Sequence, residues 1–146
     1  MDAISDWDLD AIQISSGHYW NRHQFINLPK LHIGKRSMSC ATAHHGVLLD
    51  DAFYFIFPQN NTTVQVNNNV VNVTELLIVA PGEDATSLFP NDFSAIVVAI
   101  PVPVLALCIG ESSVEKLVLQ CEQLRMGKIE TPSLLLQKQE IATLID

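Results

Sequence analysis

The amino-acid sequence predicts a mainly β fold, in which a small antiparallel β-barrel over about residues 10–101 is followed by helices over about residues 102–146. The first part consists of short apolar segments, rich in β-branched and aromatic residues, with turn residues between them. In the second part the apolar residues recur at helical spacing. No linker separates the two parts, and 146 residues suit one domain, so we expect a single domain.

The predicted strands are recognised by their period and by the turn residues that end them. Residues 30–38 alternate between apolar and polar side chains, as a half-buried strand does. Residues 52–57 are aromatic and are followed by Pro58, which is typical of a short strand buried on both faces. Asparagine tolerates positive φ, so residues 67–69 predict a tight hairpin between two valine-rich strands. Two further strands are predicted at residues 75–80 and 93–100, each followed by a proline.

The helical part begins with a capping-box pattern and contains a clear apolar stripe. Ser112 and Glu115 have the spacing of a capping box, and Gly127 is expected to end this helix. Thr131 and Pro132 then predict the start of another helix, so we expect two or three helices. The stripe of the first helix comprises Val114, Leu117, Val118, Cys121 and Leu124, and the last helix carries Leu134, Leu135, Ile141, Leu144 and Ile145.

Composition argues against several classes of protein. The net charge of −8, from 16 acidic and 8 basic residues, predicts that this chain alone does not bind DNA. Aspartates in the first residues are the opposite of a basic signal peptide, so we expect a cytoplasmic protein. The longest apolar stretch, residues 95–109, contains two prolines and is too short for a membrane helix. The isolated cysteines Cys40, Cys108 and Cys121 are expected to be buried, reduced thiols.

The histidines do not match a metal-binding barrel. A metal-binding cupin carries His-x-His on one strand, because alternate residues face the same side, together with a nearby glutamate and a later histidine. Here His44 and His45 are adjacent, so on a strand they would face opposite sides, and no histidine follows them. The sequence also contains no G-x-S-x-G motif and no glycine-rich phosphate loop. We therefore expect no catalytic residue, no metal and no cofactor, and predict that the chain is not an enzyme.

The order of these features resembles the N-terminal domain of AraC-type transcription regulators. The resemblance covers roughly residues 10–145 and is a likeness of pattern without an invariant motif. It includes the strand pair up to Ser39, the aromatic strand 53–58, the hairpin 64–69, the segment 76–83, the strand 95–101 and the helices that follow. The resemblance implies a cupin-like, jelly-roll barrel without metal chemistry that often binds a small effector. It also implies that the trailing helices form a homodimer.

In that family a separate C-terminal domain with two helix-turn-helix motifs binds DNA, and this chain contains no such domain. The predicted last helix has no stop signal before Asp146. This favours part of a longer regulator over a stand-alone sensor homologue.

Three functions follow as hypotheses. The first is an effector-sensing, dimerising regulatory domain that reaches DNA only through the missing domain. The second is a cupin-like enzyme, an isomerase or a metal-dependent oxygenase with non-standard ligands, and the third is a structural dimerisation domain with a filled barrel. The ligand-binding candidates are Trp20, His32 and Tyr54, because each joins an apolar body to a polar tip. The dimer-interface candidates are Leu117, Cys121, Leu124, Ile141 and Leu144.

Overall fold

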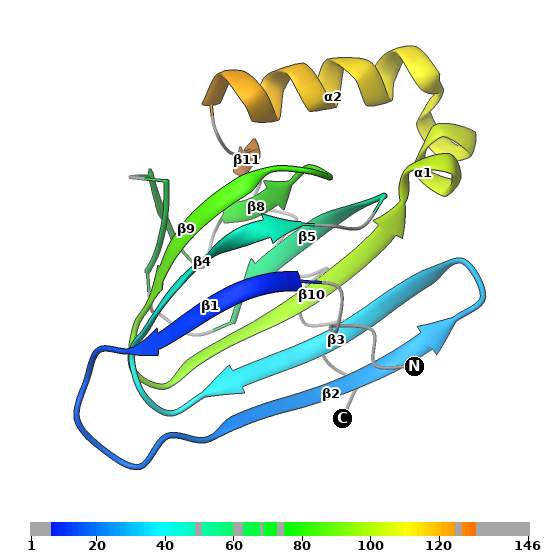
Figure 1. Ribbon diagram of the computed structural model, residues 1–146. Helices are drawn as coiled ribbons and strands as arrows, with labels where there is room; N and C mark the ends of the chain where they lie inside the picture. Colours follow the sequence, from blue (N-terminus) through cyan, green and yellow to red (C-terminus); the bar gives the residue numbers. More distant parts are fainter. Residues whose placement is uncertain are drawn as a thin grey trace.

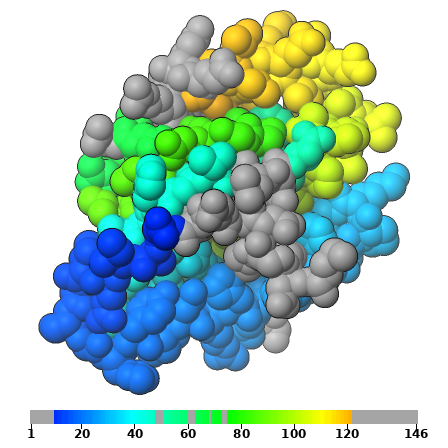
Figure 2. Space-filling view, in the orientation of Figure 1, coloured from blue at the N-terminus to red at the C-terminus, as the bar shows by residue number. Residues whose placement is uncertain are grey.

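The structure is a computed structural model that describes residues 7–48, 51–59, 63–67, 69–72, 75–124 and 127–130. Two antiparallel sheets pack face to face, and two helices lie across the outer face of one of them (Figure 1). In the space-filling view the helices form one end of the molecule, away from the first two strands (Figure 2). In the part of the chain that is described, no helix is long and apolar enough to span a membrane.

Each sheet is built from strands that are far apart in the sequence. The first sheet contains, in spatial order, β1 (Trp7–Gln13), β4 (Thr42–Leu48), β9 (Asp84–Phe89), β6 (Val64–Val66) and β7 (Asn69–Val71). The second sheet contains β11 (Gly127–Glu130), β8 (Glu75–Val79), β5 (Ala52–Pro58), β10 (Phe93–Pro101), β3 (Leu31–Met38) and β2 (Asn21–Leu28). The helices are α1 (Val102–Ile109) and α2 (Glu111–Leu124).

The path of the chain between the sheets defines the fold class. From β3 to β10 the chain passes repeatedly from one sheet to the other, with β3, β5, β8 and β10 in the second sheet and β4, β6, β7 and β9 in the first. This is the eight-stranded double-sheet arrangement of jelly rolls and cupins. The predicted mainly β, cupin-like fold with C-terminal helices is therefore confirmed. The two sheets keep separate edges, however, so the predicted closed barrel is an open sandwich.

The central strands of the second sheet are buried on both faces. On β5, Phe53 and Phe57 point to the helices, whereas Tyr54 and Ile56 point to the first sheet. Strands β8 and β10 follow the same alternation. The prediction that residues 52–57 form a strand buried on both faces is confirmed. The molecule thus has three layers: the first sheet, the second sheet and the helices.

The apolar stripe of α2 covers the outer face of the second sheet. Val114 and Cys121 are buried there, and Leu117 and Val118 pack beside them. The Cys121 thiol lies 4.0 Å from the carbonyl oxygen of Ile78 on β8. Gly110 lies between α1 and α2 and has a φ of 86°. Glycine adopts this positive φ easily and other residues rarely do, which explains why a glycine ends α1.

Several local predictions need correction. Helix α2 begins at Glu111, before the predicted cap Ser112, and ends at Leu124, before Gly127. Residues Gly127–Glu130 were expected to be a helix break but form β11, which supplies backbone partners to the edge of β8. The helix predicted from Thr131 onwards lies outside the described residues. The expectation of buried thiols holds for Cys40 and Cys121 but is wrong for Cys108, which is exposed on α1.

The burial of both faces predicts a difference between two isoleucines. Ile78 faces the helices and is 2% exposed, whereas Ile12 on β1 is 65% exposed. We expect Ile78→Val to lower the free energy of unfolding by about 0.5–1.5 kcal/mol and Ile12→Val to change it by less than about 0.5 kcal/mol. Urea unfolding of both variants checks this. Equal effects would contradict the three-layer arrangement.

Candidate functional site

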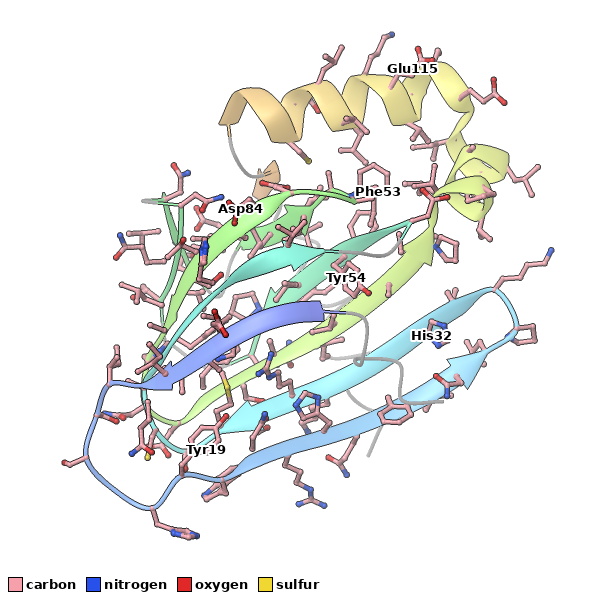
Figure 3. The ribbon with its side chains drawn as sticks, viewed as in Figure 1. Tyr19, His32, Phe53, Tyr54, Asp84 and Glu115 are labelled. Atoms are coloured by element: carbon pink, nitrogen blue, oxygen red, sulfur yellow. The ribbon has the colours of Figure 1, made fainter. Side chains whose placement is uncertain are left out.

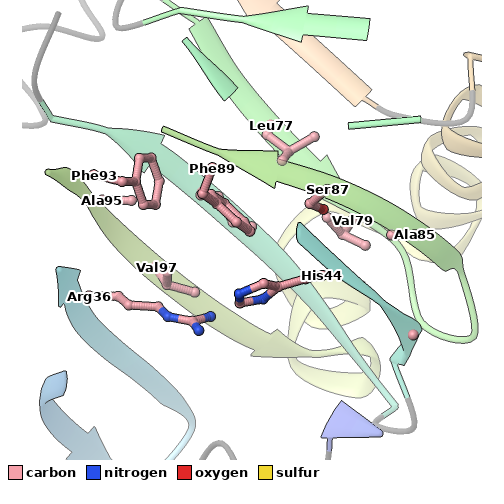
Figure 4. A pocket seen from close by; sticks show the side chains of 12 residues that line it. Arg36, His44, Leu77, Val79, Ala85, Ser87, Phe89, Phe93, Ala95 and Val97 are labelled. Atoms are coloured by element: carbon pink, nitrogen blue, oxygen red, sulfur yellow. The ribbon is translucent and has the colours of Figure 1, made fainter. Parts of the chain in front are cut away.

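A cavity of about 50 Å³ lies between the two sheets (Figure 4). A cavity needs only about 10–15 Å³ to hold a water molecule, so this one has room for a few waters or a small organic group. Most of its wall is apolar, and the two ionisable side chains in it come from opposite sheets. The lining residues are Arg36, His44, Gly46, Ile56, Leu77, Val79, Ala85, Ser87, Phe89, Phe93, Ala95 and Val97.

Arg36 brings a positive charge to the cavity from β3. Its register neighbours are His23 on β2 and Ala95 on β10, and its side chain extends along the cavity wall (Figure 4). Burial lowers the pKa of Arg36, and a hydrogen bond donated to the Tyr19 phenol acts in the opposite direction. Its Nε atom is buried and has no hydrogen-bond partner among the described residues.

His44 faces Arg36 across the cavity from β4. It is 4% exposed, and its ring packs edge-on against Phe89 with 4.9 Å between ring centroids. Burial, and then the charge of Arg36, lower the pKa of His44 to about 4. The imidazole is therefore neutral at pH 7. Its Nε2 atom, like Nε of Arg36, is buried with no hydrogen-bond partner in the described part of the chain.

The neighbouring histidine lies on the other face of β4, as the alternation predicted. His45 is exposed, and its Nδ1 atom lies 3.1 Å from Oγ1 of Thr86 and 3.7 Å from a carboxylate oxygen of Asp84. Both contacts are to β9. His45 is thus an outer-surface residue, and only His44 reaches the cavity.

A second cavity, also of about 50 Å³, lies on the other side of Arg36. Burial and the charge of Arg36 lower the pKa of His23, which lies in its wall. Arg36 and Val97 line both cavities. The second cavity is lined by His23, Gln24, Phe25, Gly34, Lys35, Arg36, Tyr54 and Val97.

The structure places the three predicted ligand-binding residues in different surroundings. Tyr54 is buried and lines the second cavity. Trp20 is 48% exposed, and His32 is exposed near the tip of the β2–β3 hairpin, with Nδ1 2.6 Å from Oδ1 of Asn27 (Figure 3). Neither Trp20 nor His32 lines these two cavities, so of the three candidates the structure brings only Tyr54 to a cavity wall.

Sequence reasoning missed Arg36 and His44. The available signal was alternation: Arg36 lies two residues before the fully buried Met38 on β3, so both point to the same side of the strand. His44 lies two residues after the buried Thr42 on β4. A polar side chain on the buried face of a strand is the feature that marks both residues.

The predicted dimer-interface residues are partly used inside the chain. Leu117 and Cys121 pack against the second sheet. The side chain of Leu124, and the whole of Ile141 and Leu144, lie outside the described residues. Among the residues described, no group of three or more histidine, cysteine, aspartate or glutamate side chains is arranged to hold a metal ion.

Comparison with solved structures finds a distant structural similarity. No family model matches the sequence, and no curated protein matches it. Among solved structures, the chain is similar to the EutQ protein of Clostridium difficile, with 14% sequence identity and a TM-score of 0.44 over 61% of this chain and 75% of that chain. The fold class given above follows from the strand order of the chain itself.

The low pKa of His44 predicts a pH-dependent stability. Since the pKa is about 4 in the folded chain and 6.5 in the unfolded chain, the unfolded chain binds the proton first as the pH falls. The contribution of His44 is complete above pH 6.5 and is lost between pH 6.5 and 4. We expect it to remove about 2 kcal/mol of stability between pH 7.5 and pH 5.

Urea unfolding at the two pH values tests this, with variants of the two adjacent histidines. His44→Gln should reduce the pH-dependent difference in stability, whereas His45→Gln should leave it close to that of the unmodified chain. The expectation is wrong if His44→Gln retains the full difference.

Proposed function

We propose that this chain is a non-catalytic, small-molecule-sensing domain of an AraC-type transcription regulator. The observation that supports this is the cavity between the sheets. Its walls are mostly apolar, and two polar atoms, Nε of Arg36 and Nε2 of His44, lie buried in it without a hydrogen-bond partner among the described residues. An apolar wall with a few convergent polar groups is the usual composition of a small-molecule site. A filled structural barrel would not leave these atoms unsatisfied.

The composition of the wall favours binding over catalysis. The described residues that line the cavity include one imidazole, one guanidinium and one hydroxyl, and none of them is a carboxylate or a thiol. A nucleophile and its general base are expected within hydrogen-bond reach of each other, but Nε2 of His44 has no such partner among the described residues. A cupin-like metalloenzyme needs several ligands around the metal, and the wall offers a single histidine.

Strand β10 provides a connection from the cavity to the helices. Ala95 and Val97 line the cavity, while Ile96 and Val98, on the opposite face of the strand, pack in the layer below the helices. The strand then continues directly into α1. A ligand that displaces the inner face of β10 therefore also displaces the surface on which α1 and α2 lie.

The proposal includes a homodimer formed by the helical part, with DNA bound through a separate helix-turn-helix domain. Leu117 and Cys121 pack inside the chain, so other apolar residues of α1 and α2 must contact a second copy. Leu107, Ile109 and Leu119 are 82%, 46% and 55% exposed. A regulator with two DNA-binding domains uses such two-fold pairing to reach paired half-sites.

Sedimentation of two leucine variants tests the dimer. Leu107→Glu should dissociate it and change the free energy of unfolding of the monomer by less than about 0.5 kcal/mol, because Leu107 is exposed in the single chain. Leu117→Glu should instead lower stability, because Leu117 packs against the sheet. A chain that is monomeric at high micromolar concentration contradicts the dimer.

Ligand binding is tested with a library of small metabolites in a thermal-shift assay. A ligand present at about 100 times its Kd stabilises a protein by about 2.7 kcal/mol, which corresponds to about 5–10 °C in Tm for a domain of this size. We expect stabilisation of the unmodified chain and of Ala11→Leu, whose side chain is exposed on β1. Ala85→Leu fills the cavity and should abolish the stabilisation by the ligand. Ligands that stabilise Ala85→Leu equally would place the site elsewhere.

A further inference from the structure

We propose that the ligand of the cavity between the sheets is a short aliphatic monocarboxylate, whose carboxylate group binds Arg36 and His44. This inference rests on the proposed function and names the chemical class of the ligand. Three features of the cavity support it: its charge, the direction of its polar atoms, and the size and polarity of its walls.

The first step is the uncompensated charge of Arg36. Among the described residues that line the cavity, Arg36 is the one that carries a permanent charge, and none of them is a carboxylate. The chain as a whole has a net charge of −8, so carboxylates are abundant elsewhere. Buried charges in proteins are normally paired, because an unpaired charge loses its hydration without compensation. The phenol oxygen of Tyr19 accepts a hydrogen bond from Arg36.

The surroundings of Arg36 beyond the cavity are also basic. His23 and Lys35 line the second cavity, on the other side of Arg36. His44 faces it from the first sheet, and burial, followed by the charge of Arg36, lowers the pKa of both histidines. Among the described residues that line the two cavities, the groups around this guanidinium include no carboxylate, which favours a ligand that brings the negative charge.

The second step is the direction of the two unpaired nitrogen atoms. Arg36 comes from β3 and His44 from β4, and their side chains lie in the same cavity (Figure 4). Nε of Arg36 is a donor, and Nε2 of a neutral histidine is a donor in one of its two tautomers. Both atoms are buried and lack partners in the described structure. A carboxylate has two oxygen atoms and can accept one hydrogen bond from each side chain.

The third step is the rest of the wall, which selects the body of the ligand. Leu77, Val79, Phe89 and Phe93 offer no hydrogen bond to a polyol, so a sugar would bury hydroxyl groups without partners. The volume of about 50 Å³ is small, which favours a small ligand over a nucleotide or a sugar phosphate. A short alkyl chain matches these walls and gains free energy from apolar contact.

Calorimetric titration of the full chain with butyrate tests the proposal, with butanamide as the neutral compound of the same shape. We expect butyrate to bind and butanamide to bind at least about tenfold more weakly, because charge-assisted hydrogen bonds are the stronger kind. Arg36→Gln should weaken butyrate binding by about ten- to a hundredfold. The matched control is Arg22→Gln, an exposed arginine on β2, which should leave binding unchanged.

A second measurement separates a ligand-binding arginine from a structural one. An arginine that is partly buried without a counterion among the described residues lowers stability, so Arg36→Met should keep or raise the Tm of the ligand-free chain. Butyrate should then raise the Tm of the unmodified chain and leave that of Arg36→Met unchanged. A large loss of stability in ligand-free Arg36→Met would assign the guanidinium a structural role and overturn the proposal.

The remaining outcomes distinguish this inference from the proposed function. If neutral compounds bind in the cavity and acetate, propionate, butyrate and isobutyrate do not, the proposal of a carboxylate ligand is wrong and the sensing function stands. Equal binding of butyrate to Arg36→Gln also overturns the role of Arg36. If neither acids nor the metabolite library bind at millimolar concentration, both proposals fall.

Discussion

Consecutive residues on β5, β8 and β10 belong to different apolar cores, and the rest of the molecule is arranged around that fact. Phe53 packs below the helices and Tyr54 packs between the sheets, and Ile96 and Ala95 divide in the same way. A register shift of one residue would exchange the two sets completely. The apolar side chains of the central strands are removed from water only if both faces of the sheet are covered. One face is covered by the first sheet and the other by α1 and α2.

Arg36 and His44 are exceptions within this apolar interior. Each occupies a position on an inner strand face, where the neighbouring residues are Met38, Thr42 and Phe93 and are almost completely buried. Both side chains have a nitrogen atom that the described residues leave unsatisfied. Such groups lower stability, and folded proteins retain them mainly where function requires them. The double coverage of the second sheet supplies apolar burial that offsets this cost.

Local sequence pattern predicted the elements that are determined by their own residues. The aromatic run of β5, the asparagine turn between β6 and β7, where Asn67 has φ of 46°, and the stripe of α2 all follow from local preferences. Strand β9 was not predicted, because its exposed Asp84, Thr86 and Leu88 alternate with only partly buried residues over most of its length. Strand β11 exists through its pairing with β8, a contact between distant segments. The assignment of strands to two separate sheets also depends on contacts between segments that are far apart in the sequence.

The candidate site was harder to predict than the fold, because residue type and residue direction gave different answers. Trp20 and His32 have suitable chemistry for a ligand site but lie on the surface, whereas Arg36 and His44 have unremarkable sequence contexts. The direction of its side chain alone would have identified Arg36 as an inward-facing residue, since Met38 on the same side of β3 is fully buried. What no single strand reveals is that β3 and β4 bring Arg36 and His44 to one cavity from opposite sheets. Arg36 and His44 lie together because the chain crosses from one sheet to the other between β3 and β4. The site therefore depends on the jelly-roll topology and not on a local sequence motif.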